Sequence, residues 1–303
     1  MAPKHYEQLP KPFLKWAGGK GDLIPIFDRC GLLPPQFSDY YEPFLGGGAM
    51  FFYLWKNGRI TGDSRLNDVN RDIVDLYNVI KENLSGLIEE LEVLKMRKDE
   101  ESFYKFRDEF NVLKNEGKWT PEKKIRKTAL LLYLNKTCFN GLYRENSKSE
   151  FNVPYGRYAN PKIFDIRNLK KVSISLKDAI VTSGDYSEAC DGVKEGDFVY
   201  FDPPYMPISE TSNFTGYHAS NFLLEDQQKL ADLYQRLSEK GAFLLLSNAY
   251  HPEIKRLFES IEGIHLNVVM AKRSISCQGN SRQPVKEYAI TNYPPRPAQA
   301  SLF

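Results

Sequence analysis

The sequence predicts an α/β protein, with a Rossmann-like sheet covered by helices on both faces and a mainly helical insertion that carries a hairpin. Short apolar runs alternate with helical periodicity in the first 70 residues, and this pattern resumes from about residue 165. Between them lies a long block in which apolar residues recur at helical spacing. We therefore expect a split α/β domain, 1–70 and 161–293, an insertion at 71–160 and a flexible tail at 294–303.

The first third begins with a loop at 13–20 that leads into an amphipathic helix containing Leu23, Ile24 and Phe27. Residues 39–44 are typical of a strand, and 45–49 of a glycine-rich turn that opens a helix over 50–55. A second strand is expected to end near Asp68.

The block after residue 71 predicts three or more helices, with apolar stripes at 73–84, 87–94 and 103–113. Thr120-Pro121-Glu122 is a typical helix start, with a capping hydroxyl, a proline in the first turn and an acid near the positive end of the dipole. Residues 151–156 favour a hairpin or an ordered loop. After the block we predict strands at 172–176, 180–183, 198–201 and 243–247, a helix at 225–240, and two final strands at 265–271 and 287–291.

Composition excludes several classes of protein. The 303 residues carry a net charge of +2 and have no apolar stretch near the ~18 residues that a membrane span requires. The N-terminus lacks the apolar region of a signal peptide. Four scattered cysteines without a Cys-x-x-Cys pair, and four histidines without metal-like spacing, favour reduced thiols, a cytoplasmic setting and no bound metal.

The most informative motif is Asp202-Pro203-Pro204-Tyr205, directly after the apolar run 198–201. The prolines end the strand, so a carboxylate and an aromatic ring lie at its carboxyl end, where open α/β sheets bind ligands. Such a group suits an exocyclic amine and the ring that bears it. An ordinary Asp-Pro-Pro turn is the alternative.

A glycine-rich turn, Gly46-Gly47-Gly48, follows the first predicted strand, and Asp68 lies about 20 residues further on. An acid at this spacing typically accepts hydrogen bonds from ribose hydroxyls. Phe51 replaces the third glycine of the dinucleotide fingerprint, which favours a nucleoside ligand such as S-adenosylmethionine. A tight turn with a surface acid is the alternative.

Gly19-Lys20 is not a P-loop, because Gly21 replaces the required Ser or Thr. Trp16 and Lys20 could instead pack on an adenine and neutralise a carboxylate. A packing Trp and a solvated Lys are the plainer interpretation.

Four motifs stand in a fixed order: FLKWAGGK (13–20), EPFLGGGA (42–49), NDVN (67–70) and DPPY (202–205). Together with YLNKTCFNGLYREN (133–146), EFNVPYGRY (150–158), PISETSNFTGYH (207–218) and KRSISCQGNSR (272–282), the sequence closely resembles the Dam-type DNA adenine-N6 methyltransferases of the D12 class. The resemblance covers nearly all of residues 13–292.

The resemblance implies an enzyme that moves a methyl group from S-adenosylmethionine to N6 of a flipped-out adenine in duplex DNA. It implies a catalytic group of Asp202, Pro203 and Tyr205. The implied cofactor contacts are Trp16, Lys20, Phe44, Gly46, Gly48, Asp68, Asp185, Tyr186 and Asp202. If the Asp202 carboxylate and the Pro203 carbonyl each accept one N6–H, the nitrogen lone pair is freed, while Tyr205 stacks on the base. The segment 206–218 is a plausible lid over the base.

The DNA-reading part is expected in the hairpin. Residues 123–157 carry eight basic side chains against Glu145 and Glu150, which suits phosphate contacts, with a solvated helix face as the alternative for 123–127. The resemblance implies Arg144 for a guanine and Leu142 and Pro154 near thymine methyls. It also implies Phe139 filling the space left by the base, with Asn140 and Lys15 as further DNA contacts. The implied target is GATC, and Glu145 has no evident role.

The tail ends in Gln299-Ala300-Ser301-Leu302-Phe303 after a proline-rich linker. It resembles the short motif that docks bacterial proteins on the replicative sliding clamp, through Gln299, Leu302 and Phe303. A frayed terminus is the alternative. We expect a cytoplasmic, nucleoid-associated monomer whose main partner is double-stranded DNA. Whether a restriction enzyme accompanies it is left open.

Two other functions fit the same scaffold. Cytosine-N4 methyltransferases use similar chemistry but more often carry Ser at the position of Asp202. A non-catalytic DNA-binding regulator is the second alternative, and the intact Asp202, Tyr205 and Asp68 argue against it.

Overall fold

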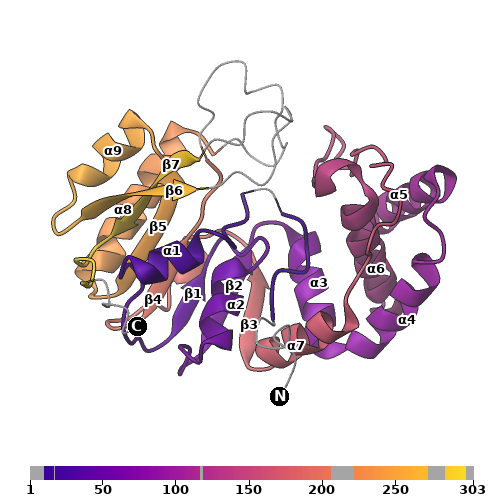
Figure 1. Ribbon diagram of the computed structural model, residues 1–303, viewed down its shortest axis with the longest axis horizontal. Coiled ribbons are helices and arrows are strands. Elements are labelled where there is room, and N and C mark those ends of the chain that lie inside the picture. The colour runs from indigo at the N-terminus through magenta and orange to yellow at the C-terminus, as the bar shows by residue number, and fades with distance from the viewer. Residues whose placement is uncertain (1–9, 17, 117–118, 206–221, 272–283, 298–303) are drawn as a thin grey trace, which may run out of the picture.

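The computed structural model of the chain describes residues 10–16, 18–116, 119–205, 222–271 and 284–297 (Figure 1). Its centre is a seven-stranded sheet with the order β3-β2-β1-β4-β5-β7-β6. The strands are β1 (Tyr40–Glu42), β2 (Ser64–Asp68), β3 (Ala179–Ser183), β4 (Phe198–Phe201), β5 (Phe243–Ala249), β6 (His265–Ala271) and β7 (Val285–Thr291). Only β7 among them runs antiparallel to its neighbours, β5 and β6. The predicted α/β class is confirmed.

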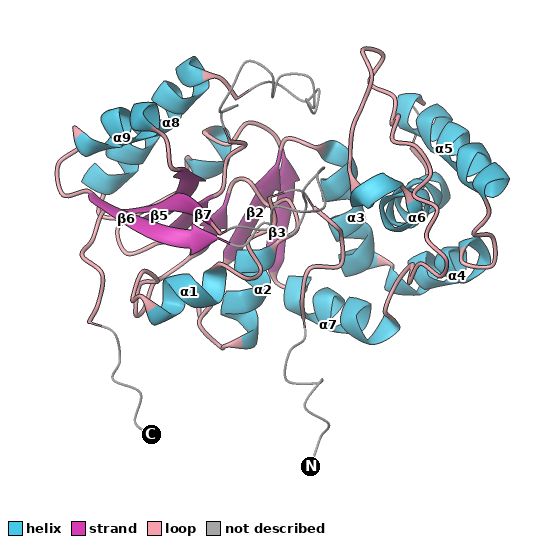
Figure 2. Cartoon of the chain, turned by 45° about the horizontal axis from the view of Figure 1, so that its top comes forward, coloured by secondary structure: helices cyan, strands magenta, loops and turns pink. Residues whose placement is uncertain are grey.

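Helices cover both faces of the sheet (Figure 2). Helices α1 (Ile24–Arg29), α2 (Ala49–Lys56), α3 (Arg71–Glu82) and α7 (Ile166–Leu176) share a core with Tyr40 and Phe198. Helices α8 (Leu224–Glu239) and α9 (Pro252–Glu259) share a second core with Tyr41 and Val199. Neighbouring residues of one strand thus enter different cores, as strand geometry requires.

The strand predicted at 172–176 is wrong, because these residues form the end of α7. The run Val172-Ser173-Ile174-Ser175-Leu176 alternates in polarity like a strand. However, Asp165 caps a helix by accepting bonds from the Arg167 and Asn168 N–H groups, and Val172 and Leu176 are buried four residues apart. The helix start upstream decides the structure.

The insertion contains α4 (Leu84–Leu94), α5 (Glu100–Asn115) and α6 (Pro121–Thr137), on the right of Figure 1. The predicted start of α6 is confirmed, with Thr120 Oγ accepting the Lys123 N–H at 3.3 Å. A short 3₁₀ turn, η2 (Phe139–Gly141), then leads into a hairpin with isolated bridges between Cys138 and Tyr155 and between Glu145 and Phe151.

The insertion shares its hydrophobic core with the sheet. One cluster of buried side chains runs from Phe27 and Tyr40 through α3 to Leu91, Phe110 and Leu134. Helix α3 contacts β2 and β3 as well as α4 and α6. The division into 1–70 plus 161–293 and 71–160 stays a prediction, and α3 belongs physically to both parts.

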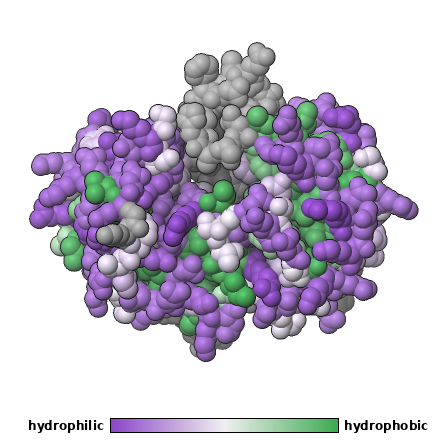
Figure 3. All heavy atoms as spheres, turned by 180° about the vertical axis from the view of Figure 1, so that it is seen from behind, coloured by the Kyte–Doolittle hydropathy of each residue, from purple (hydrophilic) through white to green (hydrophobic). Residues whose placement is uncertain are grey.

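Hydrophilic side chains cover most of the face seen in Figure 3, with smaller hydrophobic patches between them. No helix within the described ranges is long and apolar enough to cross a membrane. In the same ranges, no group of three or more His, Cys, Asp or Glu side chains is placed to hold a metal ion.

Candidate active site and DNA interface

The glycine-rich turn lies between the end of β1 and the start of α2. Gly46 and Gly48 have φ values of +46° and +66°, in the left-handed region that glycine adopts readily. A Cβ atom on Gly46 would lie 2.8 Å from Cδ1 of Trp16. The two residues implied as cofactor contacts therefore pack directly against each other, and only glycine fits at position 46.

Asp68 ends β2 and faces this turn. Its Oδ2 accepts the Gly46 N–H at 2.8 Å, and its Oδ1 accepts the Asn70 N–H at 2.8 Å. Burial raises the pKa of Asp68, and the two backbone hydrogen bonds lower it in part. The carboxylate is thereby fixed in orientation at the carboxyl edge of the sheet, where a ribose hydroxyl could approach it.

Phe44 and Tyr186 stack with ring centroids 5.0 Å apart, and Phe222 contacts the edge of Phe44 at 5.8 Å. Burial raises the pKa of Tyr186 to about 12, so this ring stays neutral. Asp185 is exposed and accepts hydrogen bonds from the Ser187 N–H and Oγ. Tyr186 thus belongs to a group of aromatic rings with Phe44 and Phe222, whereas Asp185 caps a turn. Phe222 was not predicted.

The Asp202 carboxylate directly follows β4 and is held through one oxygen. Its Oδ1 lies 2.8 Å from Nζ of Lys20 and accepts the Ser247 hydroxyl at 2.9 Å. Within the described residues, no donor approaches its Oδ2. Ser247 was missed in the sequence, although it is the first polar residue after the apolar run of β5, the strand beside β4. Lys20 and Ser247 thus fix the orientation of the carboxylate through Oδ1.

Lys20 brings the cofactor motif and the DPPY motif together. Its ammonium donates to the Gly18 carbonyl at 2.8 Å and pairs with Asp202, which leaves one of its three N–H groups for another acceptor. The same ammonium lies 4.5 Å from the centroid of the Tyr205 ring. The sequence did not predict a Lys20–Asp202 ion pair.

The rest of the DPPY motif is also held by specific contacts. The Tyr205 hydroxyl donates to Oε2 of Glu287 at 2.7 Å, and burial raises the pKa of this tyrosine well above its ordinary value. The Pro204 carbonyl accepts from the Gln227 side chain at 3.4 Å. Pro203 is buried. Glu287 and Gln227 were not predicted, because both come from elements far away in the sequence.

Glu42 is a buried acid beneath the site that sequence reasoning also missed. Its Oε2 accepts from the Tyr40 hydroxyl at 2.8 Å and from the Phe51 N–H at 3.1 Å. Burial raises the pKa of Glu42 to about 8, against the lowering effect of these hydrogen bonds. The buried acid therefore stabilises the start of α2, because it accepts the N–H of Phe51 in the first turn of that helix.

The hairpin places the implied DNA-contacting residues at or near the surface. Phe139 is 48% exposed, Arg144 and Pro154 are exposed, and Leu142 is half-buried. Asn140 has a left-handed φ of +54°. Arg144 donates through Nε to Oδ1 of Asn152 across the hairpin at 2.7 Å. The hairpin thus presents a row of side chains of the kinds that DNA readers use.

Lys15 lies against this hairpin from the N-terminal loop. A Cβ atom on Gly141 would come within 2.3 Å of Cδ of Lys15, and the Lys15 ammonium lies 4.4 Å from the Tyr158 ring centroid. The buried Asn135 side chain bonds to both the N–H and the carbonyl of Lys15, and to the Gly141 carbonyl. Asn135 was not predicted, although a lone Asn inside an apolar helix stripe is a signal of such a role.

The basic residues at 123–127 are paired with acids within the protein. Lys123 pairs with Glu116, Lys124 with Asp75, and Arg126 with Glu90 and Glu109. Lys127 is 1% exposed and pairs with Asp72 and Asp75. The expectation that this group contacts DNA phosphates is wrong for Lys127, and the other three cations are already neutralised. Paired residues on a helix are the better interpretation.

Some predicted site segments lie outside the described residues. These are the lid segment 206–218, the motif at 272–282, and the tail residues Gln299, Leu302 and Phe303.

The described residues fit S-adenosylmethionine. A fixed carboxylate for ribose hydroxyls, an indole over a glycine turn, a stacked aromatic wall and a lysine N–H for a carboxylate occur at one edge of the sheet. Each group matches a different part of that molecule.

Comparisons with known proteins agree with this arrangement. A family model described as "D12 class N6 adenine-specific DNA methyltransferase" matches residues 16–275. The chain is 42% identical over 296 residues to the type II methyltransferase M.MjaIII of Methanocaldococcus jannaschii, covering 93% of this chain and 99% of that protein.

Two further relatives have similar coverage. Type II methyltransferase M1.LlaDCHI of Lactococcus lactis subsp. cremoris is 37% identical, with 93% of this chain and 95% of that protein covered. The DNA adenine methylase of Escherichia coli K12 is 35% identical, with 91% and 93% covered. The chain belongs to the D12 class of N6 adenine-specific DNA methyltransferases, which use S-adenosylmethionine.

Proposed function

We propose that the enzyme methylates N6 of an adenine that is flipped out of duplex DNA, and that its target sequence is GATC. The observation that carries the catalytic part is the Asp202 carboxylate, with Oδ1 held by Lys20 and Ser247 and with no donor at Oδ2 among the described residues. A carboxylate oriented in this way is ready to accept one hydrogen bond from an amine.

In the proposed mechanism, Oδ2 of Asp202 and the Pro203 carbonyl each accept one N6–H of adenine. The nitrogen lone pair is then withdrawn from the ring and can attack the electrophilic methyl group. The fixed position of the amine by itself strongly favours this attack. Tyr205 stacks on the base, and the bond to Glu287 holds its hydroxyl away from the reaction. Because a paired base cannot reach this edge of the sheet, the adenine leaves the duplex at a cost of a few kcal/mol.

The cofactor supplies an electrophilic methyl group when it is bound. We propose that Asp68 holds the ribose of the cofactor and that Phe44 and Tyr186 border its adenine. Trp16 would pack on the cofactor beside Gly46 and Gly48. Lys20 would hold the carboxylate of its methionine part with the remaining N–H. Asp185 would act at the edge of this pocket through the turn that it caps.

For DNA, we propose that Arg144 exchanges its bond with Asn152 for a bidentate contact to a guanine of GATC. Leu142 and Pro154 would contact thymine methyl groups. Phe139 would fill the space that the adenine leaves, and Asn140 and Lys15 would contact the adjoining backbone or bases. The row of exposed or half-exposed residues on one hairpin supports this assignment.

Transfer of tritium from S-adenosylmethionine to duplexes that contain GATC, or each of its single-base variants, tests activity and target together. We expect label only in adenine of GATC. Asp202→Ala should abolish transfer. Efficient methylation of another sequence would refute the target, and near-normal transfer by Asp202→Ala would refute the mechanism.

Arg144→Ala should lose discrimination at one base pair by about 1–3 kcal/mol. Lys148→Ala is the matched control, since Lys148 is exposed on the same hairpin. An equal loss of affinity on all sequences for both variants would count against base reading by Arg144.

We also propose that Gln299, Leu302 and Phe303 dock on the replicative sliding clamp, with the enzyme otherwise a monomer. The support is the order of a Gln and two apolar residues behind a proline-rich linker. Titration of a peptide of residues 294–303 against the clamp tests this, and no binding at about 100 μM, where even a weak peptide contact should register, would reject it.

A further inference from the structure

Tyr143 lies between two proposed DNA-contacting residues, Leu142 and Arg144, but its side chain points into the protein. It is 5% exposed. Its ring centroid lies 5.7 Å from that of Trp16 in the cofactor loop and 5.8 Å from that of Phe151 on the opposite arm of the hairpin. The ring therefore contacts both the cofactor side and the DNA-reading side.

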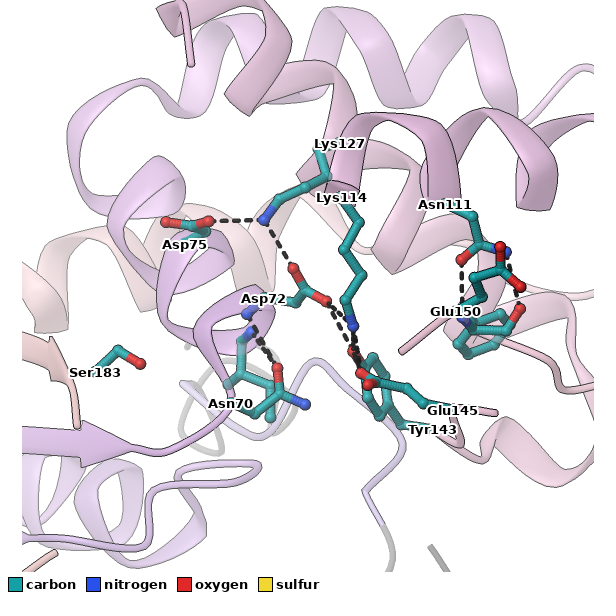
Figure 4. Close-up of polar contacts among 12 residues, drawn as sticks. Asn70, Asp72, Asp75, Asn111, Lys114, Lys127, Tyr143, Glu145, Glu150 and Ser183 are labelled. Carbon is teal, nitrogen blue, oxygen red and sulfur yellow. Dashed lines mark hydrogen bonds and ion pairs between the residues drawn. The ribbon is translucent and has the colours of Figure 1, made fainter. Parts of the chain in front are cut away.

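The Tyr143 hydroxyl joins a buried group of charges that we call the Asp72 cluster: Asp72, Lys114, Tyr143 and Glu145 (Figure 4). This hydroxyl lies 2.7 Å from Oδ2 of Asp72 and also contacts Glu145. A hydroxyl has one proton for these two carboxylates. Lys114 supplies the missing donors, because its ammonium contacts the Tyr143 oxygen at 3.0 Å, Asp72 at 3.2 Å, and Glu145.

Charge balance explains Glu145, the acid next to the proposed guanine reader. Facing DNA, a carboxylate there would repel phosphates. Instead it pairs with Lys114 inside the protein, where its side chain is 17% exposed. Glu145 therefore acts on the hairpin rather than on DNA.

The Asp72 cluster is attached to the N-terminal end of α3, which also supports Asp68, the proposed ribose-binding residue. Asp72 lies in the first turn of α3, and its N–H donates to the capping Asn70 side chain at 3.0 Å. The Asn70 N–H donates in turn to Asp68. Lys127 holds the other Asp72 oxygen at 2.7 Å. Three successive contacts thus connect Asp68 with the hairpin.

We propose that Tyr143 and Glu145 are positioning residues that fix the recognition hairpin to the start of α3, and so determine how strictly the enzyme selects its DNA sequence. This inference rests on the proposed function of the hairpin as the DNA reader. The proposed ribose-binding carboxylate of Asp68 and the proposed DNA-reading side chains are both held at the start of α3. This shared attachment fixes the position of the target base relative to the reaction site.

The test compares Tyr143→Phe and Glu145→Gln with Tyr133→Phe. Tyr133 is a matched control, because it is a buried tyrosine of α6 whose hydroxyl donates to the Arg97 carbonyl and not to a member of the Asp72 cluster. For each variant, kcat/KM is measured on the duplex that the wild type methylates best and on its single-base variants, together with KM for S-adenosylmethionine.

We expect Tyr143→Phe and Glu145→Gln each to reduce the selectivity ratio by about tenfold, since each breaks a buried bond to a charged group. KM for DNA should rise while KM for the cofactor stays nearly unchanged. The double variant should be no less selective than the less selective of the two single variants, because both substitutions remove contacts between the hairpin and the start of α3. Tyr133→Phe should keep the wild-type ratio.

Equal selectivity in Tyr143→Phe and Tyr133→Phe, or additive losses in the double variant, would overturn the inference. Hydrogen exchange provides a readout that needs no DNA. Amides of residues 144–152 should exchange about tenfold faster in Tyr143→Phe than in Tyr133→Phe, and equal exchange would also overturn it. Absence of methylation by the wild type would instead count against the proposed function.

Discussion

Lys127 is the residue whose replacement should destabilise the protein most clearly. Its ammonium is almost fully buried and lies 2.7 Å from both Asp72 and Asp75. Lys127→Met keeps the apolar stem but leaves two buried carboxylates with one partner less each. Breaking a buried pair in this way typically costs 3–5 kcal/mol, or about 3 kcal/mol here, because Lys114 and Lys124 still lie 3.2 Å from the two acids.

The matched control is Lys123→Met, on the same helix. Lys123 pairs with Glu116 at 2.7 Å, but both side chains are about 40% exposed, so the loss should stay below about 1 kcal/mol. Unfolding by urea at pH 7 gives the free energy. By heat, a loss of 3 kcal/mol should lower Tm by about 5 °C, given an unfolding entropy near 2 cal/mol/K per residue.

The pH dependence gives a second check. Burial alone would raise the pKa of Asp72, yet Lys127 and Lys114 hold it below its ordinary value. In the wild type, this stabilisation is present above the ordinary Asp pKa of about 3.9 and is lost as the pH falls through the lowered value. The difference in the free energy of unfolding between wild type and Lys127→Met should therefore become smaller at acid pH. A free energy of unfolding within 1 kcal/mol of that of Lys123→Met at pH 7 (roughly the error of such comparisons) would refute the reasoning.

Three further outcomes concern the site. Gly46→Ala should weaken cofactor binding by about tenfold or more in calorimetry, because its φ is +46° and the new Cβ would lie 2.8 Å from Trp16; Gly21→Ala, where nothing lies within 4 Å, should have no effect. Ser247→Ala should lower kcat several-fold, since losing a hydrogen bond to Asp202, the proposed catalytic carboxylate, costs about 1 kcal/mol, and an unchanged single-turnover rate would contradict this. The pKa of Glu42 is raised by burial to about 8, so wild-type stability should fall as the pH rises from about 4.5 to about 8, by up to 1.4 kcal/mol per unit; Glu42→Gln should flatten that slope in urea titrations.

Local patterns were sufficient for most of the fold. The helix start at Thr120-Pro121 and the buried strand before Asp202 were both predicted, because capping chemistry and apolar runs are properties of neighbouring residues. The segment 172–176 shows the limit of this approach. Its alternation matched a strand, and the cap at Asp165, which lies outside that window, starts the helix that contains it.

The residues of the candidate site also divide into those that could be predicted from neighbouring residues in the sequence and those that could not. Asp202, Asp68 and the glycine turn lie in contiguous motifs and could be named from the sequence. Ser247 and Glu287 could not, since they reach the DPPY motif only through strand order, with β5 and β7 placed side by side. The role of Glu145 depends on Lys114, which is 31 residues away in sequence.

The continuous core that joins the sheet to α4, α5 and α6 has a consequence for how such an enzyme acquires a new target sequence. Exchange of the whole insertion between relatives would expose or mismatch apolar surface along α3, and the hybrid would lose folding cooperativity. Changes confined to exposed hairpin positions, such as Phe139, Arg144 and Pro154, leave that core intact. With the hairpin as the proposed DNA reader, we expect new specificities to be more accessible by point substitution in the hairpin than by exchange of the insertion as a module.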